Sequence, residues 1–289
     1  MYFDKIKEHF QDEVTIYGAN MGTEKGLKFA MLSEAKHEVE YTDEELEIVK
    51  GFEKKVLELY ERAENGSLDE TTVNPPQIED GKLVVKVGLI SHCCAGNMET
   101  LRNMAVGGIL ASEWFGKRES EGEGFMCAFA SKFVVHSHPM LDRWEKDHVH
   151  PGRRGGCVIL FDESNPLMQA LISNDFFEYE YIKRTMPEKL PELYSPEIIK
   201  FFDMIVEPNS PAGKKMHDRD RPRQSSGWLA IPGGIPPQLI NGIGIGAESE
   251  LYEHIDEIRE MFPNAIIYNE NLEVVALSWN EEHDDKFAK

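Results

Sequence analysis

The sequence predicts an α+β fold with a mixed, mainly antiparallel β core and an N-terminal helical segment. Short apolar runs with the character of strands recur between residues 83 and 277, without the regular strand–helix alternation of a doubly wound sheet. A long amphipathic pattern lies before residue 80. Hydrophobic residues make up 41% of the 289 residues, which is sufficient for a packed core. We therefore expect a helical segment at residues 1–80 and an α+β domain at residues 81–289.

The clearest helix signal begins at Thr42. Glu45 follows three residues later, as a capping box requires. Apolar residues then recur at steps of three and four, at positions 46, 49, 52, 56, 59 and 63. Asn65-Gly66 is a plausible end of this helix. The segment 69–80, with Pro75-Pro76, predicts a loop and a domain boundary.

The remaining elements follow in order from residue 82. Leu83–Ile90 is apolar and rich in valine, which predicts a strand. Asn97 predicts the N-cap of a short helix over 98–106 that ends at Gly107-Gly108. Further strands are expected at 125–135, 157–161, 228–231 and 243–245, further helices at 165–171, 195–205 and 248–262, and a terminal hairpin within 265–277.

The charge balance excludes several classes of partner. The chain has 31 basic and 52 acidic residues, a net charge of −21. Such a surface repels nucleic acid and anionic membranes unless its basic residues are locally concentrated. No apolar run approaches the roughly 20 residues of a membrane-spanning helix. The N-terminus MYFDKIKEHFQDEV is charged and lacks the apolar core of a signal peptide, so we expect a cytoplasmic protein.

The four cysteines, Cys93, Cys94, Cys127 and Cys157, show no CxxC spacing. Adjacent cysteines bridge each other only with strain, so Cys93 and Cys94 are not expected to pair. The favoured interpretation is a set of reduced, mostly buried thiols in a cytosolic protein.

A histidine group offers one candidate site. His136 and His138 alternate in the segment HSHP, and alternate residues of a strand point to the same face, where two imidazoles can chelate zinc. The segment resembles the start of the metal motif of JAMM-type zinc isopeptidases. The next two positions of that motif hold Lys146 and Val149 here, and Val149 stands where the third ligand belongs. We therefore predict no tightly bound zinc, and a zinc-dependent hydrolase remains an alternative.

Basic residues gather in two segments of this acidic chain. Arg153 and Arg154 lie beside glycines at 152, 155 and 156, and Lys214, Lys215, Arg219, Arg221 and Arg223 lie in a second loop. If the two loops meet, they form a phosphate-attracting patch. The alternative is a solvated charge run, and nucleic acid is a partner only if these loops cluster.

Three segments together resemble a known family. His92, at the end of a predicted strand, precedes a short helix that leads to GILAS at 108–112. GGCVILFDESNPL follows within 152–167, and WLAIPGGIPPQLINGIGI follows Gln224. In this order they resemble ADP-ribosyltransferase-fold proteins, particularly the DarT-like group that modifies DNA bases, over residues 83–277.

The resemblance implies a fold and a set of roles. The fold is two facing, mainly antiparallel sheets around a cleft, and the cofactor is NAD. His92 contacts the NAD ribose or amide, and Gln224 faces the target as the catalytic polar residue. Arg153, Arg154 and Arg223 hold phosphate or the target. The resemblance leaves the macromolecular acceptor open.

The sequence departs from the family at one position. Family members place a catalytic glutamate at the start of the late strand, where it stabilises positive charge developing on the ribose. Here Ser225–Trp228 contains no acid. Either another carboxylate takes its place, with candidates at Glu113, Glu119, Glu121 and Glu123, or the fold is kept for nucleotide binding. A non-catalytic acidic interaction protein is a third alternative.

Overall fold

The structure is a computed structural model. It describes residues 2–11, 14–17, 23–27, 31, 33, 42–65, 73, 75–85, 89–110, 127–132, 150–151, 156–162, 173–174, 176–206, 228–232 and 234–278.

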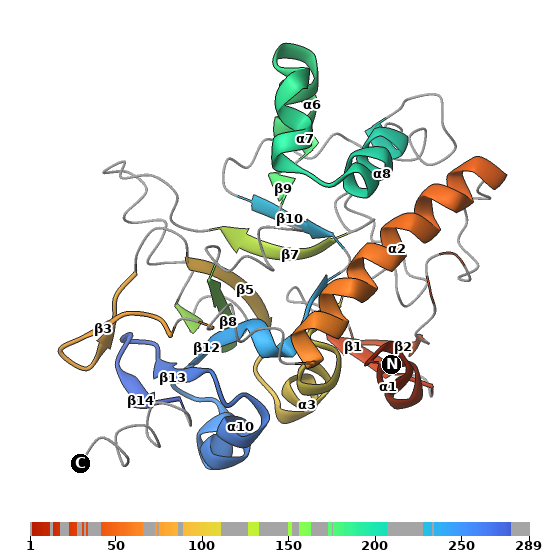
Figure 1. Ribbon diagram of the computed structural model, residues 1–289. Helices are drawn as coiled ribbons and strands as arrows, with labels where there is room; N and C mark the ends of the chain where they lie inside the picture. Colours follow the sequence, from red (N-terminus) through yellow and green to blue (C-terminus); the bar gives the residue numbers. More distant parts are fainter. Residues whose placement is uncertain are drawn as a thin grey trace.

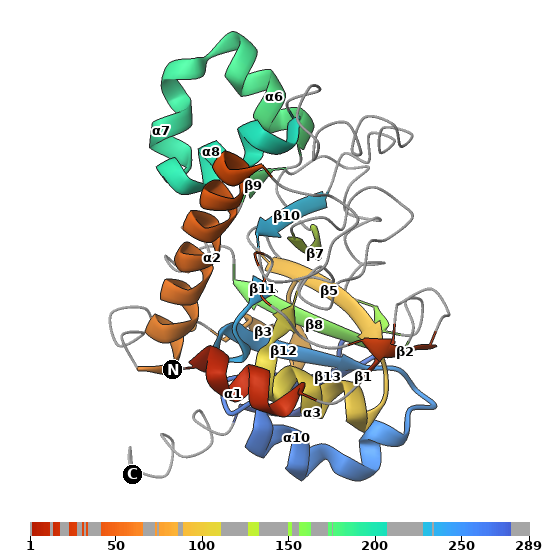
Figure 2. The ribbon, with the colours of Figure 1, turned by 90° about the vertical axis from the view of Figure 1, so that its right-hand side faces the viewer.

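An eight-stranded sheet forms the centre of the molecule, in the order β14-β13-β12-β8-β5-β7-β10-β9. Figure 2 shows most of these strands stacked from β10 at the top to β13 below. Their bounds are β5 Leu89–Ala95, β7 Cys127–Lys132, β8 Gly156–Asp162, β9 Ser173–Asn174, β10 Trp228–Pro232, β12 Ile240–Ile245, β13 Ile266–Asn269 and β14 Val274–Ala276. The pair β12–β13 is parallel, and the other pairs within the described sheet are antiparallel. The prediction of a mixed, mainly antiparallel core is confirmed.

The resemblance predicted two facing sheets around a cleft. The described strands of the core form a single eight-stranded sheet instead. Strand β5 pairs with β8 on one side and with β7 on the other, so it joins the two groups of strands into one sheet. The other described strands form two-stranded sheets. These are β1 Val14–Tyr17 with β2 Thr23–Leu27, β3 Ile78–Glu79 with β4 Lys82–Leu83, and β6 Ile109–Leu110 with β11 Gly234–Ile235.

Helices cover the sheet and extend beyond it at one end (Figure 1). The described helices are α1 Tyr2–His9, α2 Asp43–Glu64, α3 Met98–Gly107, α6 Phe176–Thr185, η4 Pro187–Lys189, α7 Leu190–Leu193, α8 Pro196–Val206, η5 Pro237–Leu239, η6 Glu250–His254 and α10 Ile255–Met261. Helix α2 has the predicted capping box between Thr42 and Glu45. Helix α3 has the predicted Asn97 cap, and its C-cap Gly108 has a φ of 67°.

Two predicted elements differ from the structure. The strand expected at Leu83–Ile90 lies later, as β5 at Leu89–Ala95. The prediction ended the strand before the polar residues Ser91 and His92, which lie inside it. The helix expected over 248–262 is a 3-10 turn, η6, followed by the shorter α10. The segment 165–171 lies outside the described residues.

The register of β5 against β8 sorts their side chains onto two faces. Seven residue pairs run from Leu89 with Asp162 to Ala95 with Gly156. Because side chains alternate along a strand, every second pair shares a face. Cys157, Ile159 and Phe161 of β8 belong to the large core that includes the helices, whereas the intervening side chains of β8 face the β3–β4 hairpin.

Glycines in β12 make room for larger neighbours on the hairpin side. A Cβ at Gly242 would lie 2.8 Å from the Leu160 side chain. A Cβ at Gly244 would lie 2.5 Å from the ring of Tyr268. Both contacts are shorter than real Cβ atoms show, so Leu160 and Tyr268 fill the space that the glycines leave.

The N-terminal helices share a core with the sheet. Helix α2 runs from α1 to α8 (Figure 2), and its apolar face joins the same buried cluster as β8 and β12. The Tyr60 hydroxyl donates to the Gly107 carbonyl at 3.0 Å. The boundary expected near residue 80 falls within the turn between β3 and β4, where Asp80 and Gly81 have φ of 51° and 73°. Positive φ at both central residues is typical of a tight two-residue hairpin turn.

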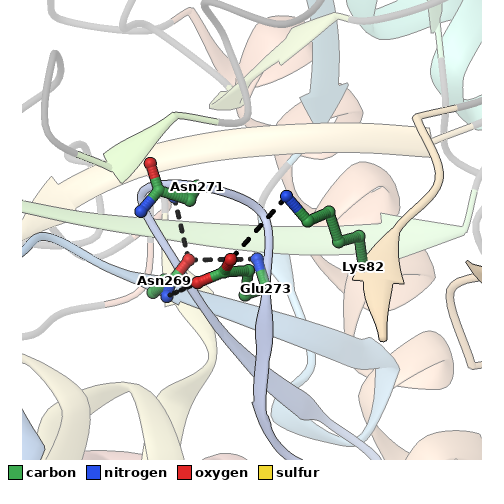
Figure 3. A network of polar contacts seen from close by, with 4 residues as sticks. All are labelled: Lys82, Asn269, Asn271 and Glu273. Carbon is green, nitrogen blue, oxygen red and sulfur yellow. Dashed lines mark hydrogen bonds and ion pairs between the residues drawn. The ribbon is translucent and has the colours of Figure 1, made fainter. Parts of the chain in front are cut away.

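A polar network fixes the turn between β13 and β14 (Figure 3). The Asn269 Oδ1 atom accepts from the backbone amides of Asn271 and Glu273 at 2.8 and 3.0 Å. Its Nδ2 donates to Glu273 at 2.9 Å, and Lys82 lies 3.7 Å from the other oxygen of that carboxylate. Leu272 has a φ of 62° in this turn, so the network supports a strained conformation and ties it to β4.

The backbones of Gly96 and Gly156 approach closely just after β5 ends. A Cβ at Gly96 would lie 2.9 Å from the Gly156 carbonyl carbon. The Gly246 amide donates to the Gly156 carbonyl at 3.0 Å, and Ser249 Oγ donates to the Gly96 carbonyl at 3.4 Å. Backbone atoms therefore exclude a side chain at position 96, and Gly156 has a φ of 95°, which residues with a side chain rarely adopt.

Gly96→Ala is predicted to destabilise the protein by about 1–3 kcal/mol, because its methyl group meets rigid backbone. Gly51→Ala is the matched control, since nothing lies within 4 Å of a Cβ built at that helical position. The control is expected to stabilise α2 by about 0.5–1 kcal/mol. Urea unfolding of both variants measures the difference. Equal stability of the two variants would contradict the close approach at Gly96.

Candidate functional site

The candidate site is centred on His92, in the middle of β5. The sequence placed this residue at the end of a strand, and that expectation is wrong: three residues of β5 precede His92 and three follow it. The register pairs His92 with Ile159, so its imidazole shares the helix-covered face of the sheet with Cys94 and Cys157.

The environment keeps the His92 imidazole neutral. The side chain is mostly buried, and among the described residues no hydrogen bond to it is found. Burial disfavours the charged form and lowers the pKa of His92 from 6.5 to about 4. A neutral imidazole presents one N–H donor and one nitrogen acceptor. The site can therefore accept a proton, or bind a polar group that has both a donor and an acceptor.

The first predicted basic segment directly precedes β8 in the chain and joins the sheet next to the end of β5. Arg153 and Arg154 lie outside the described residues. They precede Gly156, the first residue of β8, by three and two positions. Gly156 pairs with Ala95, the last residue of β5.

The second predicted basic segment precedes β10 in the chain and joins the sheet nearer the start of β5. Arg223 and Gln224 also lie outside the described residues, and they precede Trp228, the first residue of β10. Strands β10 and β5 run in the same direction, because each is antiparallel to β7. Trp228 pairs with Ser131 of β7, which pairs with Ser91 near the start of β5. The two basic segments thus join the sheet from opposite ends of β5, and the predicted patch requires the loops to fold toward each other.

The register also brings together two residues that the sequence analysis left apart. Cys94 and Cys157 are directly opposite each other on β5 and β8, and both are buried thiols. Alternation within each strand indicates which face a residue takes, but it does not indicate which residue of another strand lies opposite. This pairing therefore had no signal in the sequence.

The structure leaves the proposed zinc motif open. His136 and His138 lie outside the described residues, as do Glu113, Glu119, Glu121 and Glu123. Within the described ranges, no group of three or more His, Cys, Asp or Glu residues is placed to hold a metal ion. The helices of the described part include none long and apolar enough to cross a membrane.

Comparison with models of protein families, with curated proteins and with solved structures finds no match to this chain.

The lowered pKa of His92 predicts a specific pH dependence. Between pH of about 4 and 6.5 the unfolded state binds more protons at this residue than the folded state, so stability falls as the pH drops through this window. His92→Gln removes the titrating group and keeps hydrogen-bonding capacity. Because the imidazole is not wholly buried, we expect the variant to lose about 1–2 kcal/mol less than wild type between about pH 7 and about pH 5.

Urea unfolding at the two pH values measures this difference. His254→Gln is the control, because the His254 side chain is 39% exposed, whereas His92 is mostly buried. Identical pH dependence of wild type and His92→Gln would show that the imidazole is not desolvated.

Proposed function

We propose that the protein binds NAD or a related nucleotide at a site on β5 that includes His92, and that it is an ADP-ribosyltransferase-like protein. The order of the three sequence segments supports this proposal, as does the mainly antiparallel sheet to which they contribute β5, β8, β10 and β12.

The observation that carries the proposal is the state of His92. The His92 side chain is partly exposed, so a ligand can reach its ring nitrogens. The imidazole of His92 is neutral and makes no hydrogen bond among the described residues. A ribose hydroxyl or a carboxamide can both donate and accept, and therefore matches the two ring nitrogens. A charged imidazole would have offered two donors only.

The phosphates of a nucleotide need cations, because the chain carries a net charge of −21. Arginine suits this role, since its planar fork pairs with two phosphate oxygens at once. Arg153 and Arg154 are the favoured residues. They lie two or three positions from β8, the direct neighbour of β5, whereas Arg223 lies five positions from β10, which β7 separates from β5.

Transfer of ADP-ribose makes a further demand that binding does not. It needs a carboxylate to stabilise positive charge on the ribose, and Ser225–Trp228 supplies none. In the proposed enzyme this carboxylate comes from Glu113, Glu119, Glu121 or Glu123. Gln224 then faces the target group. If none of these acids reaches the ribose, the protein is a nucleotide-binding relative without transferase activity.

The test is a calorimetric titration of NAD and of ADP-ribose into the full chain. Arg154→Ala is expected to weaken binding about ten- to a hundred-fold, the effect of losing a charge-assisted hydrogen bond of about 1.5–3 kcal/mol. His92→Ala removes a neutral hydrogen bond of about 0.5–1.5 kcal/mol and is expected to weaken binding about two- to ten-fold. Arg223→Ala is expected to have a smaller effect than Arg154→Ala.

Arg102→Ala is the control for charge alone, because Arg102 lies exposed on α3 and forms an ion pair with Glu257 at 2.8 Å. Its affinity should match that of wild type. No binding by the wild-type protein at millimolar nucleotide would refute the proposal. Binding that neither His92→Ala nor Arg154→Ala weakens would place the site elsewhere.

A further inference from the structure

Cys94 and Cys157 form a directly opposed pair at the centre of the sheet. They are register partners in β5 and β8, and both side chains belong to the large core. Directly opposite residues of antiparallel strands have Cα atoms about 4.5 or 5.5 Å apart, depending on the type of pair. Both values lie within the range of about 4.4–6.8 Å that a disulfide requires.

The surrounding strands hold this pair in place. The next pair in the register is Ala95 with Gly156, and beyond it the backbones of Gly96 and Gly156 approach too closely to admit a Cβ at position 96. Opposed Cβ atoms lie about 4.5–5.5 Å apart in a sheet, and a disulfide needs about 3.5–4.5 Å. Closing the bridge therefore requires a movement of about 1 Å.

The two thiols differ in access to solvent. Cys94 keeps 4% of its surface exposed, whereas Cys157 keeps none. A small oxidant that reaches this part of the core therefore meets Cys94 first. Cys93, the neighbouring cysteine, has Val158 and not Cys157 as its register partner.

We propose that Cys94 and Cys157 are a redox-responsive pair, which a peroxide oxidises to a disulfide between β5 and β8. The Cys94 sulfur attacks hydrogen peroxide, the O–O bond breaks, and a sulfenic acid and one water form. The Cys157 sulfur then attacks the Cys94 sulfur, the S–O bond breaks, and a second water leaves. Two thiols lose two electrons and two protons in total, and the peroxide is reduced to two waters.

The bridge would fix the strand pair beside His92. Cys94 lies two residues from His92 on the same face of β5, and Cys157 is diagonal to His92 across the pair. Oxidation therefore locks the register next to the candidate site. This inference does not depend on nucleotide binding, and its test uses none.

The experiment exposes the full chain to hydrogen peroxide, then denatures it and alkylates the remaining thiols with N-ethylmaleimide. Wild type is expected to gain two maleimides after oxidation, compared with four for the reduced protein. Peptide mapping should join Cys94 to Cys157. Cys93→Ser is the matched control and should form the same bridge, which also distinguishes Cys94 from its neighbour in the mapped peptide.

Cys157→Ala should form no such bridge, and circular dichroism verifies its fold. A second measurement uses wild type only: the midpoint of urea unfolding should rise on oxidation and return on addition of a reductant. The proposal is overturned if wild type keeps four alkylatable thiols. A bridge that involves Cys127, a Cys93–Cys94 bridge, or sulfinic acid at Cys94 without a bridge would overturn it equally.

Discussion

The seven-residue pairing of β5 with β8 determines where the candidate functional side chains of the described core lie. It joins the two halves of the eight-stranded sheet, and it turns His92, Cys94 and Cys157 toward the helix-covered face. A slip of one residue would turn the whole of one strand to the opposite face. The neutral state of His92 and the opposition of the two thiols both follow from this single register.

Glycine makes this register and its surroundings sterically possible. Gly96 and Gly156 let the ends of β5 and β8 approach, and Gly242 and Gly244 leave space for the side chains that close the other face. A glycine also lies where the N-terminal helices pack on the sheet. Gly108 turns the chain with a positive φ, next to the Gly107 carbonyl that accepts a hydrogen bond from Tyr60 of α2. Helices and sheet therefore share one core, and a side chain at one of these closely packed glycines is expected to disturb it.

Local signals in the sequence predicted the local structure well. The capping box at Thr42 and the Asn97 and Gly108 caps are short-range interactions, so α2 and α3 were predicted nearly to the residue. Strand β5 was placed too early because its polar centre, Ser91 and His92, looked like the end of an apolar run. Strand order and register depend on contacts between residues far apart in the sequence. For that reason neither the single sheet nor the cysteine pair was predicted. The neutral state of the His92 imidazole depends on its burial, which the sequence pattern does not reveal.

The most direct test of this account is the backbone register of β5 and β8 in solution. Cross-strand nuclear Overhauser effects between backbone protons of deuterated, isotope-labelled protein report it without any substitution. The account predicts contacts between Cys94 and Cys157 and between His92 and Ile159. Contacts of Cys94 with Gly156 or Val158 as its direct partner would show a slipped register and would contradict the account.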